Sequence, residues 1–106
     1  MIPQSEALFA VLLEVRSHLE KPGNDFSWSG WESSTEALAE LDPFIEALRQ
    51  NEKPRRASLE FLFLPTGPIQ EVSLSSGWGN TFTELADRFD QAVVSAYATD
   101  NKSHEA

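Results

Sequence analysis

The sequence of 106 residues predicts a single α+β domain, with a small antiparallel sheet covered on one face by three helices. Two observations lead to this fold class: two short alternating apolar runs separated by a proline- and glycine-rich turn, and apolar residues spaced three and four positions apart elsewhere. The expected order is helix, short strand or loop, helix, strand, strand, helix. The domain is expected to span residues 1–99, and the polar tail at 100–106 is expected to fray.

A β-hairpin is predicted over residues 58–74. Apolar residues alternate with others on both sides of Pro65-Thr66-Gly67-Pro68, and a period of two is typical of strands. Each proline fixes φ and removes a backbone donor, while the glycine can adopt a positive φ, so the chain is expected to turn there. The expected core joins this hairpin to the last helix and consists of Leu59, Phe61, Phe63, Val72, Leu74, Leu85, Phe89 and Val93.

Three helices are predicted from the spacing of apolar residues. The first covers residues 5–20 and ends at a Lys-Pro-Gly-Asn sequence. The second begins where Ser33 and Glu36 have the spacing of a capping box, and we expect it to kink or restart at Pro43. A second box of the same kind predicts that the last helix begins at Thr81.

Between the first two helices, Phe26 and Trp28 alternate with polar residues. This pattern fits either a short third strand or an ordered aromatic loop. We favour the strand, because an isolated two-stranded sheet is only marginally stable. A sheet with so few strands leaves unpaired backbone groups at its edge, which would allow a homodimer to form there.

The charge and the absence of cysteine limit the function. The net charge of −9 opposes nonspecific nucleic acid and anionic membrane binding, since both need positive potential, and it is compatible with a basic protein partner. Without cysteine, disulfides, thiol nucleophiles and cysteine-ligated metals are excluded, and a cytoplasmic location is favoured. Neither a signal peptide nor a membrane span is predicted.

Catalytic chemistry has little support in the sequence. His18 and His104 lie far apart and have no cysteine to accompany them, so we predict no metal site, cofactor or catalytic residue. Glu84, Asp87 and Asp90 lie in the last predicted helix and could pair for acid–base work or bind calcium, but a solvated face is the simpler interpretation. The two glycines of Gly77-Trp78-Gly79 are too few for a phosphate loop or a dinucleotide fingerprint.

The tryptophans and an acidic run carry the functional hypothesis. Ser-Gly-Trp occurs twice before a predicted helix, ending at Trp31 and at Trp78. We favour the interpretation that these rings staple the helix starts; the alternative is that they join Trp28 in a surface anchor for a partner. Glu32, Glu36 and Glu40 place carboxylates at four-residue spacing. The favoured interpretation of this acidic run is solubility, and the second is docking on a basic protein surface.

The sequence supports two functional hypotheses. The leading hypothesis is a non-enzymatic, acidic protein-binding module, such as a regulator, inhibitor or accessory subunit, that uses its acidic helix and exposed tryptophans. The alternative is a small-ligand or enzyme-like domain. Its pocket would lie between the Trp28/Trp31 loop and the Gly77-Trp78-Gly79 turn, with Glu84 or Asp87 as the polar group.

Overall fold

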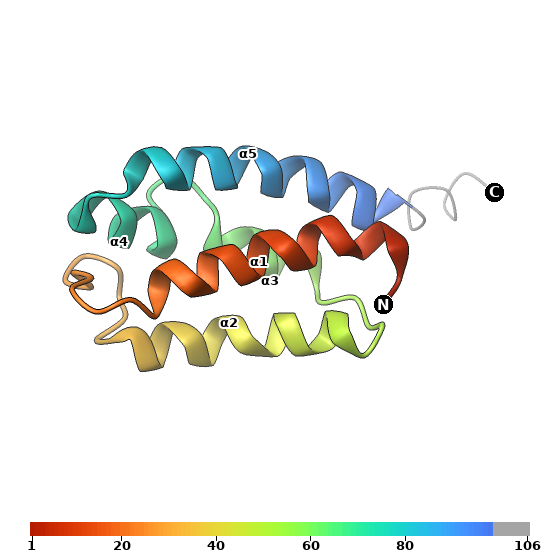
Figure 1. The fold of residues 1–106 in the computed structure, drawn as a ribbon, viewed down its shortest axis with the longest axis horizontal. Helices are drawn as coiled ribbons and strands as arrows, with labels where there is room; N and C mark the ends of the chain where they lie inside the picture. The colour runs from red at the N-terminus through yellow and green to blue at the C-terminus, as the bar shows by residue number, and fades with distance from the viewer. Residues whose placement is uncertain (99–106) are drawn as a thin grey trace.

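The computed structural model describes residues 1–98, and these residues form an all-helical fold (Figure 1). The predicted α+β class is therefore wrong, because no strand occurs in this part of the chain. The predicted domain limit at residue 99 and the tail at 100–106 lie outside the described residues. The elements are η1 (Pro3–Ser5), α1 (Glu6–Leu19), α2 (Ser34–Arg49), α3 (Arg56–Leu62), α4 (Pro68–Ser76) and α5 (Gly79–Ala96).

The three long helices lie side by side, with α1 between α2 and α5 (Figure 1). The short helix α4 packs against α5, and α3 lies behind α1 in the view shown. No helix among residues 1–98 is both long and apolar enough to cross a membrane. Since the described residues contain no sheet, the sheet edge proposed for a homodimer has no counterpart in the fold.

The core is built from one apolar side of each long helix. Burial of a large aliphatic side chain contributes roughly 1.5–3 kcal/mol, so the helices are held mainly by this contact. The buried residues recur at intervals of three and four, as one face of a helix requires. They include Leu8, Leu12, Val15 and Leu19 of α1, Ala37, Leu41, Ile45 and Leu48 of α2, and Phe82, Leu85, Phe89, Val93 and Ala96 of α5.

The first predicted strand is the helix α3. Leu59, Leu62 and Phe63 are buried, whereas Phe61 is 57% exposed. The nearly continuous apolar run fits the two-residue period of a strand and the 3.6-residue period of a helix. Positions 59, 61 and 63 share a strand face, whereas positions 59, 62 and 63 share a helix face. Packing on the rest of the protein selects the helical set.

The second predicted strand is the helix α4. Ile69 and Val72 are fully buried, but Leu74, placed in the core by the strand interpretation, is 61% exposed. Pro68 occupies the first turn of this helix, where its missing N–H costs no hydrogen bond. A proline that predicted a hairpin turn therefore begins a helix.

Residues 27–29 form a turn closed by the Ser29 N–H, which donates to the Phe26 carbonyl at 3.1 Å, so the ordered aromatic loop replaces the favoured third strand. Helix α2 is assigned without interruption through Pro43, so it does not restart there. Ser33 is its N-cap but makes no side-chain capping bond; instead, Glu36 accepts the backbone N–H of Glu32 at 3.1 Å. The capping-box prediction is thus wrong in detail although it placed the helix start.

Helix α5 begins at Gly79, earlier than the predicted start at Thr81. Trp78 is its N-cap residue, and no side chain caps the helix. Just before it, Gly77 has a φ of +88°, and the Trp78 N–H donates to the Ser73 carbonyl at 2.8 Å. This left-handed glycine ends α4 and lets the chain reverse into α5.

A tight turn over residues 64–67 joins α3 to α4. The Gly67 N–H donates to the Leu64 carbonyl oxygen at 2.8 Å, with Pro65 and Thr66 between them. Thr66 has a φ of +62°, a conformation that β-branched residues rarely adopt. A Cβ atom on Gly67 would lie 2.8 Å from the Leu64 carbonyl oxygen, so the turn has no room for a larger residue there.

Substitutions at Thr66 and Gly67 of this turn should differ in their effect on stability. Thr66→Gly removes the steric cost of positive φ, roughly 1–2 kcal/mol, and the greater chain entropy of glycine offsets roughly 0.5–1 kcal/mol of that gain. We therefore expect an unchanged free energy of unfolding or a rise of up to about 1 kcal/mol. Gly67→Ala should lower it by about 1–3 kcal/mol. Chemical denaturation measures both free energies of unfolding. A larger loss for Thr66→Gly than for Gly67→Ala would contradict this turn geometry.

Candidate functional site

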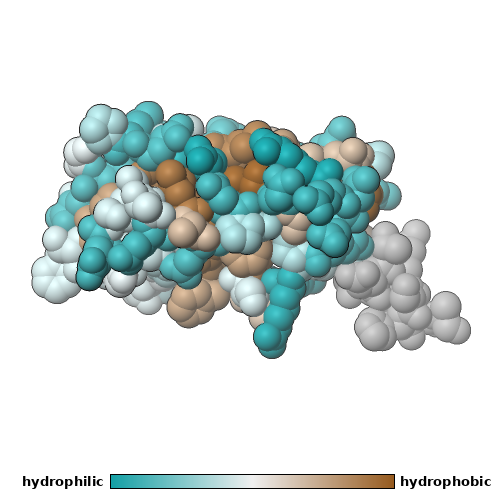
Figure 2. Space-filling model, turned by 90° about the horizontal axis from the view of Figure 1, so that it is seen from below, coloured by the Kyte–Doolittle hydropathy of each residue, from teal (hydrophilic) through white to brown (hydrophobic). Residues whose placement is uncertain are grey.

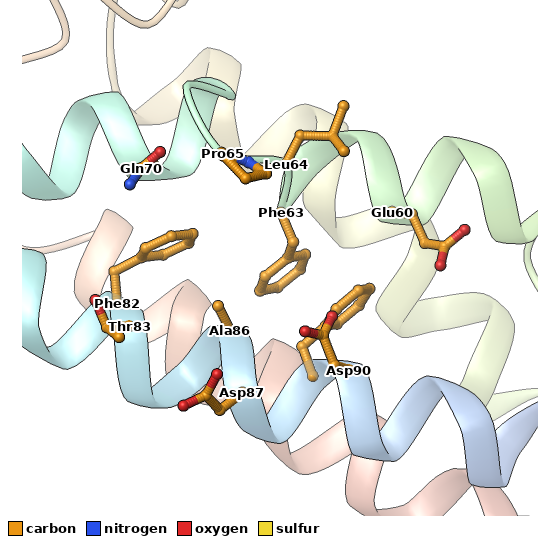
Figure 3. A pocket seen from close by; sticks show the side chains of 11 residues that line it. Glu60, Phe63, Leu64, Pro65, Gln70, Phe82, Thr83, Ala86, Asp87 and Asp90 are labelled. Carbon is orange, nitrogen blue, oxygen red and sulfur yellow. The ribbon is translucent and has the colours of Figure 1, made fainter.

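A groove of about 430 Å³ lies between the α3–α4 segment and α5 (Figure 3). Helix α3 and the turn after it supply one wall, and successive turns of α5 supply the other. Apolar side chains form its floor, and carboxylates stand at its margins. We call it the acid-rimmed groove, with floor residues Phe63, Phe82, Ala86 and Phe89 and rim residues Glu60, Asp87 and Asp90.

Three phenylalanine rings fix the floor. The Phe63 ring lies almost parallel to that of Phe89, with the centroids 3.9 Å apart and the planes inclined by 8°. On its other side it faces Phe82, with the centroids 6.4 Å apart. All three side chains are largely buried, so the floor is a packed aromatic surface whose position is set by the core beneath it.

The rim is negatively charged and only partly neutralised. Glu60 forms an ion pair with Arg56 at 3.4 Å. The carboxylates of Asp87 and Asp90 are exposed, and neither forms an ion pair with another of residues 1–98. Figure 3 shows both on the α5 side of the groove. A cation at this margin would therefore meet two carboxylates that form no ion pair within the described part of the chain.

Apolar surface continues beyond the groove. Leu64, on its lip, is 47% exposed. Phe61 lines a second hollow of about 430 Å³ between α2 and α3, which also includes Phe44. On the side of the molecule drawn in Figure 2, apolar residues surface among hydrophilic ones. Phe61 of α3 and Leu64 in the turn after it thus leave apolar surface exposed beside the groove.

The structure separates the predicted tryptophans. Trp28 is 75% exposed, at the tip of the loop between α1 and α2. Trp31 is buried, and its indole N–H donates to the Glu40 carboxylate. Trp31 packs in the core against α2, so of these two indoles Trp28 is the one that reaches the solvent.

Trp78 is half-buried and joined to the end of α1. Its indole N–H donates to the Asn24 side-chain oxygen at 2.9 Å, and its ring stacks on His18 with the centroids 4.9 Å apart. The same turn touches the loop between α1 and α2, where the Asp25 N–H donates to the Ser76 hydroxyl at 2.8 Å. Loop and turn are in direct contact where the alternative hypothesis expected a pocket.

The other predicted site residues fall into two groups, one at the start of α2 and the other around the start of α5. Glu32 and Glu36 are exposed at the start of α2, and Glu84 is exposed on α5. A Cβ atom on Gly79 would lie 2.9 Å from the Leu74 side chain, so this glycine allows close packing of α4 on α5. Among the predicted ligand residues, Asp87 alone lines the acid-rimmed groove.

Sequence reasoning did not assign Glu60 or Phe63 to a site, and it considered Asp90 only with Glu84 and Asp87, as part of a solvated face. One usable signal was present: Asp87 and Asp90 are three residues apart and border the apolar stripe of an amphipathic helix. The opposite wall gave no such signal, because residues 59–64 were predicted to form a strand. The pairing of Glu60 with the α5 carboxylates is therefore visible only in the fold.

Residues 1–98 contain no group of three histidine, aspartate or glutamate side chains placed to hold a metal ion. The sequence matches no family model, and comparisons with curated proteins and with solved structures give no match either. The activity must therefore be inferred from the chemistry of the surface.

The stack of His18 on Trp78 predicts a pH dependence of stability. Burial lowers the pKa of His18 from its ordinary value of 6.5, the charge of Lys21 lowers it further, and Glu14 opposes the shift. The unfolded chain then binds a proton more readily than the folded one. The contribution of neutral His18 to the free energy of unfolding should be fully present above pH 6.5. It should fall as the pH drops from 6.5 through the folded-state pKa of His18.

An NMR titration of His18 and denaturation between about pH 7.5 and 5.5 would test this prediction. Glu14 has a pKa lowered from 4.5, mainly by its hydrogen bond with Arg88, so it titrates below this window. His18→Phe keeps an aromatic ring on Trp78 and should show a flatter pH dependence. A His18 pKa above 6.5 in the folded protein would refute the prediction.

Proposed function

We propose that this protein is a non-enzymatic binding module that holds a basic, amphipathic segment of a protein partner in the acid-rimmed groove. One observation carries the proposal: a floor of three stacked phenylalanines is edged by carboxylates from two different helices. This combination complements a segment with apolar residues on one side and lysine or arginine beside them.

The floor supports the affinity of such a complex. A volume of about 430 Å³ can receive one or two large apolar side chains, and each contributes roughly 1.5–3 kcal/mol when fully buried. The packed rings of Phe63 and Phe89 need no rearrangement to accept them, which limits the entropy lost on binding. The exposed Leu64 extends the apolar contact at the lip.

The charged rim supports the orientation of the bound segment and the rate of its association. Exposed ion pairs contribute only roughly 0.2–1 kcal/mol each, so Asp87 and Asp90 select a cationic segment without dominating its affinity. The net charge of −9 adds a long-range attraction for a basic partner, which salt weakens. A cytoplasmic location stays a prediction, based on the absence of cysteine from the sequence.

The polar groups in the groove favour binding over catalysis. The Thr83 hydroxyl donates to the Gly79 carbonyl, as hydroxyls within helices commonly do. The Gln70 amide oxygen accepts the Thr66 N–H and so supports the turn. His18 lies against Trp78 and not in the groove. Within the described chain, the groove therefore contains no nucleophile hydrogen-bonded to a base.

The test uses a synthetic amphipathic helix of leucine and lysine, added to the 15N-labelled protein and followed by NMR. We expect chemical shift changes at Phe82, Ala86 and Asp87. A double variant, Asp87→Asn with Asp90→Asn, should weaken binding about twofold to thirtyfold, the value of two exposed ion pairs. Ala86→Trp should abolish it by filling the groove.

The matched control changes the net charge equally at exposed positions outside the groove and away from α5, as Glu6→Gln with Glu52→Gln. This control should bind the peptide within about twofold of the wild type, because distant charges are largely screened. Equal weakening by the two double variants would refute the groove as the binding site, as would equally tight binding of a leucine–glutamate helix.

A further inference from the structure

The loop between α1 and α2 is fixed at its base to three helices. The Asn24 amide donates to the His18 carbonyl at 2.7 Å, and its oxygen accepts the Trp78 indole N–H. The Asp25 N–H donates to the Ser76 hydroxyl at 2.8 Å. These bonds connect the loop to the end of α1, the end of α4 and the start of α5.

The tip of the same loop is fixed by short-range hydrogen bonds. The Asp25 carboxylate accepts the Ser27 N–H at 2.9 Å, which closes an Asx turn. The Ser29 hydroxyl donates to the Phe26 carbonyl at 2.8 Å and accepts the Trp31 N–H at 3.0 Å. The backbone on both sides of residue 28 is therefore held in place.

Trp28 projects from this fixed backbone with 75% of its surface exposed. Its indole forms no hydrogen bond or ring contact with residues 1–98, unlike the indoles of Trp31 and Trp78. A tryptophan on an ordered loop offers a large contact area with only two side-chain torsions to restrict. Such residues are enriched among those that dominate binding energy at protein interfaces.

The charge near Trp28 indicates what would contact it. Residues 22–48 contain no lysine or arginine. Hydrogen bonds from Ser27 lower the pKa of Asp25, so the carboxylate in the loop itself stays ionised at neutral pH. Tryptophan is the aromatic residue that binds cations best, and a guanidinium stacks flat on its ring. The acidic residues of this stretch are Asp25, Glu32, Glu36, Glu40, Asp42 and Glu46.

We propose that Trp28 forms a second contact surface, separate from the acid-rimmed groove, which receives an arginine side chain of a basic protein partner. The guanidinium stacks on the exposed indole, while Asp25 and Glu32 supply the negative potential that attracts it. Lysine would gain less, because the ammonium ion is compact and more strongly hydrated.

The test is an NMR titration of the full chain with a hexa-arginine peptide, with hexalysine and hexaglutamate as comparison peptides. Trp28, Trp31 and Trp78 each give an indole N–H signal. We expect the Trp28 signal to shift with hexa-arginine, to shift less with hexalysine and to stay in place with hexaglutamate. The signals of the two hydrogen-bonded indoles should change little.

Trp28→Ala should weaken hexa-arginine binding about fivefold, and Trp28→Phe should weaken it less. Because the side chain is exposed, neither variant should change the free energy of unfolding. The Asp87→Asn with Asp90→Asn variant should leave the Trp28 shift intact, and Trp28→Ala should leave binding of the leucine–lysine helix intact. Failure of either surface is thereby distinguished from failure of the other.

Three outcomes would overturn the proposal. The first is unchanged hexa-arginine affinity in Trp28→Ala, which would mean general attraction to an acidic protein. The second is an equal Trp28 response to hexalysine, which would remove the preference for arginine. The third is a response of Trp28 to phosphatidylcholine vesicles without a response to hexa-arginine, which would identify a lipid contact.

Discussion

The stacking of Phe63 on Phe89 is the contact on which the acid-rimmed groove depends. Phe63 directly follows α3, and its ring lies 3.9 Å from that of Phe89 in the middle of α5. This contact fixes how closely the α3–α4 segment approaches α5. The tight turn at residues 64–67 follows at once, so the same ring that closes the core also sets the position of the groove's lip.

The remainder of the fold supports this contact in two ways. Helices α1, α2 and α5 form a scaffold held by aliphatic burial, with α1 in the middle (Figure 1). The reversal at Gly77 then brings α4 back onto α5, so that both ends of the α3–α4 segment are constrained. The turn does not cover the apolar floor completely, and the carboxylates of Glu60, Asp87 and Asp90 stand at the margins of the opening.

The sequence predicted the long helices well, because each has an amphipathic pattern sustained over several turns. Residues 5–20 were predicted and Glu6–Leu19 is observed. Residues 58–74 were predicted wrongly, because a short apolar run fits a strand and a helix equally. Neither propensity nor turn chemistry resolves that choice: Pro68 is as suitable for the start of a helix as for a hairpin turn. The deciding contact is with α5, which is distant in sequence.

The same limit applies to the functional residues. The exposure of Trp28 is compatible with the surface-anchor interpretation. Trp31 and Trp78 pack at helix starts, where the favoured staple interpretation placed them. These outcomes depend on hydrogen bonds to Glu40 and Asn24, and residue spacing does not reveal such partners. Asp87 was a candidate, but the opposite wall of its groove, with Glu60 and Phe63, belongs to a segment that was predicted to be a strand.

The central claim is that residues 56–62 form a helix that turns Phe63 inward and leaves Phe61 outside. Comparison of the free energies of unfolding of Phe63→Ala and Phe61→Ala tests it most directly, because the two side chains would share one face of a strand but point in opposite directions after a helix. The fold predicts a loss of about 3–5 kcal/mol for Phe63→Ala and of less than about 1 kcal/mol for Phe61→Ala. Large and similar losses for both would contradict the helical assignment and, with it, the groove.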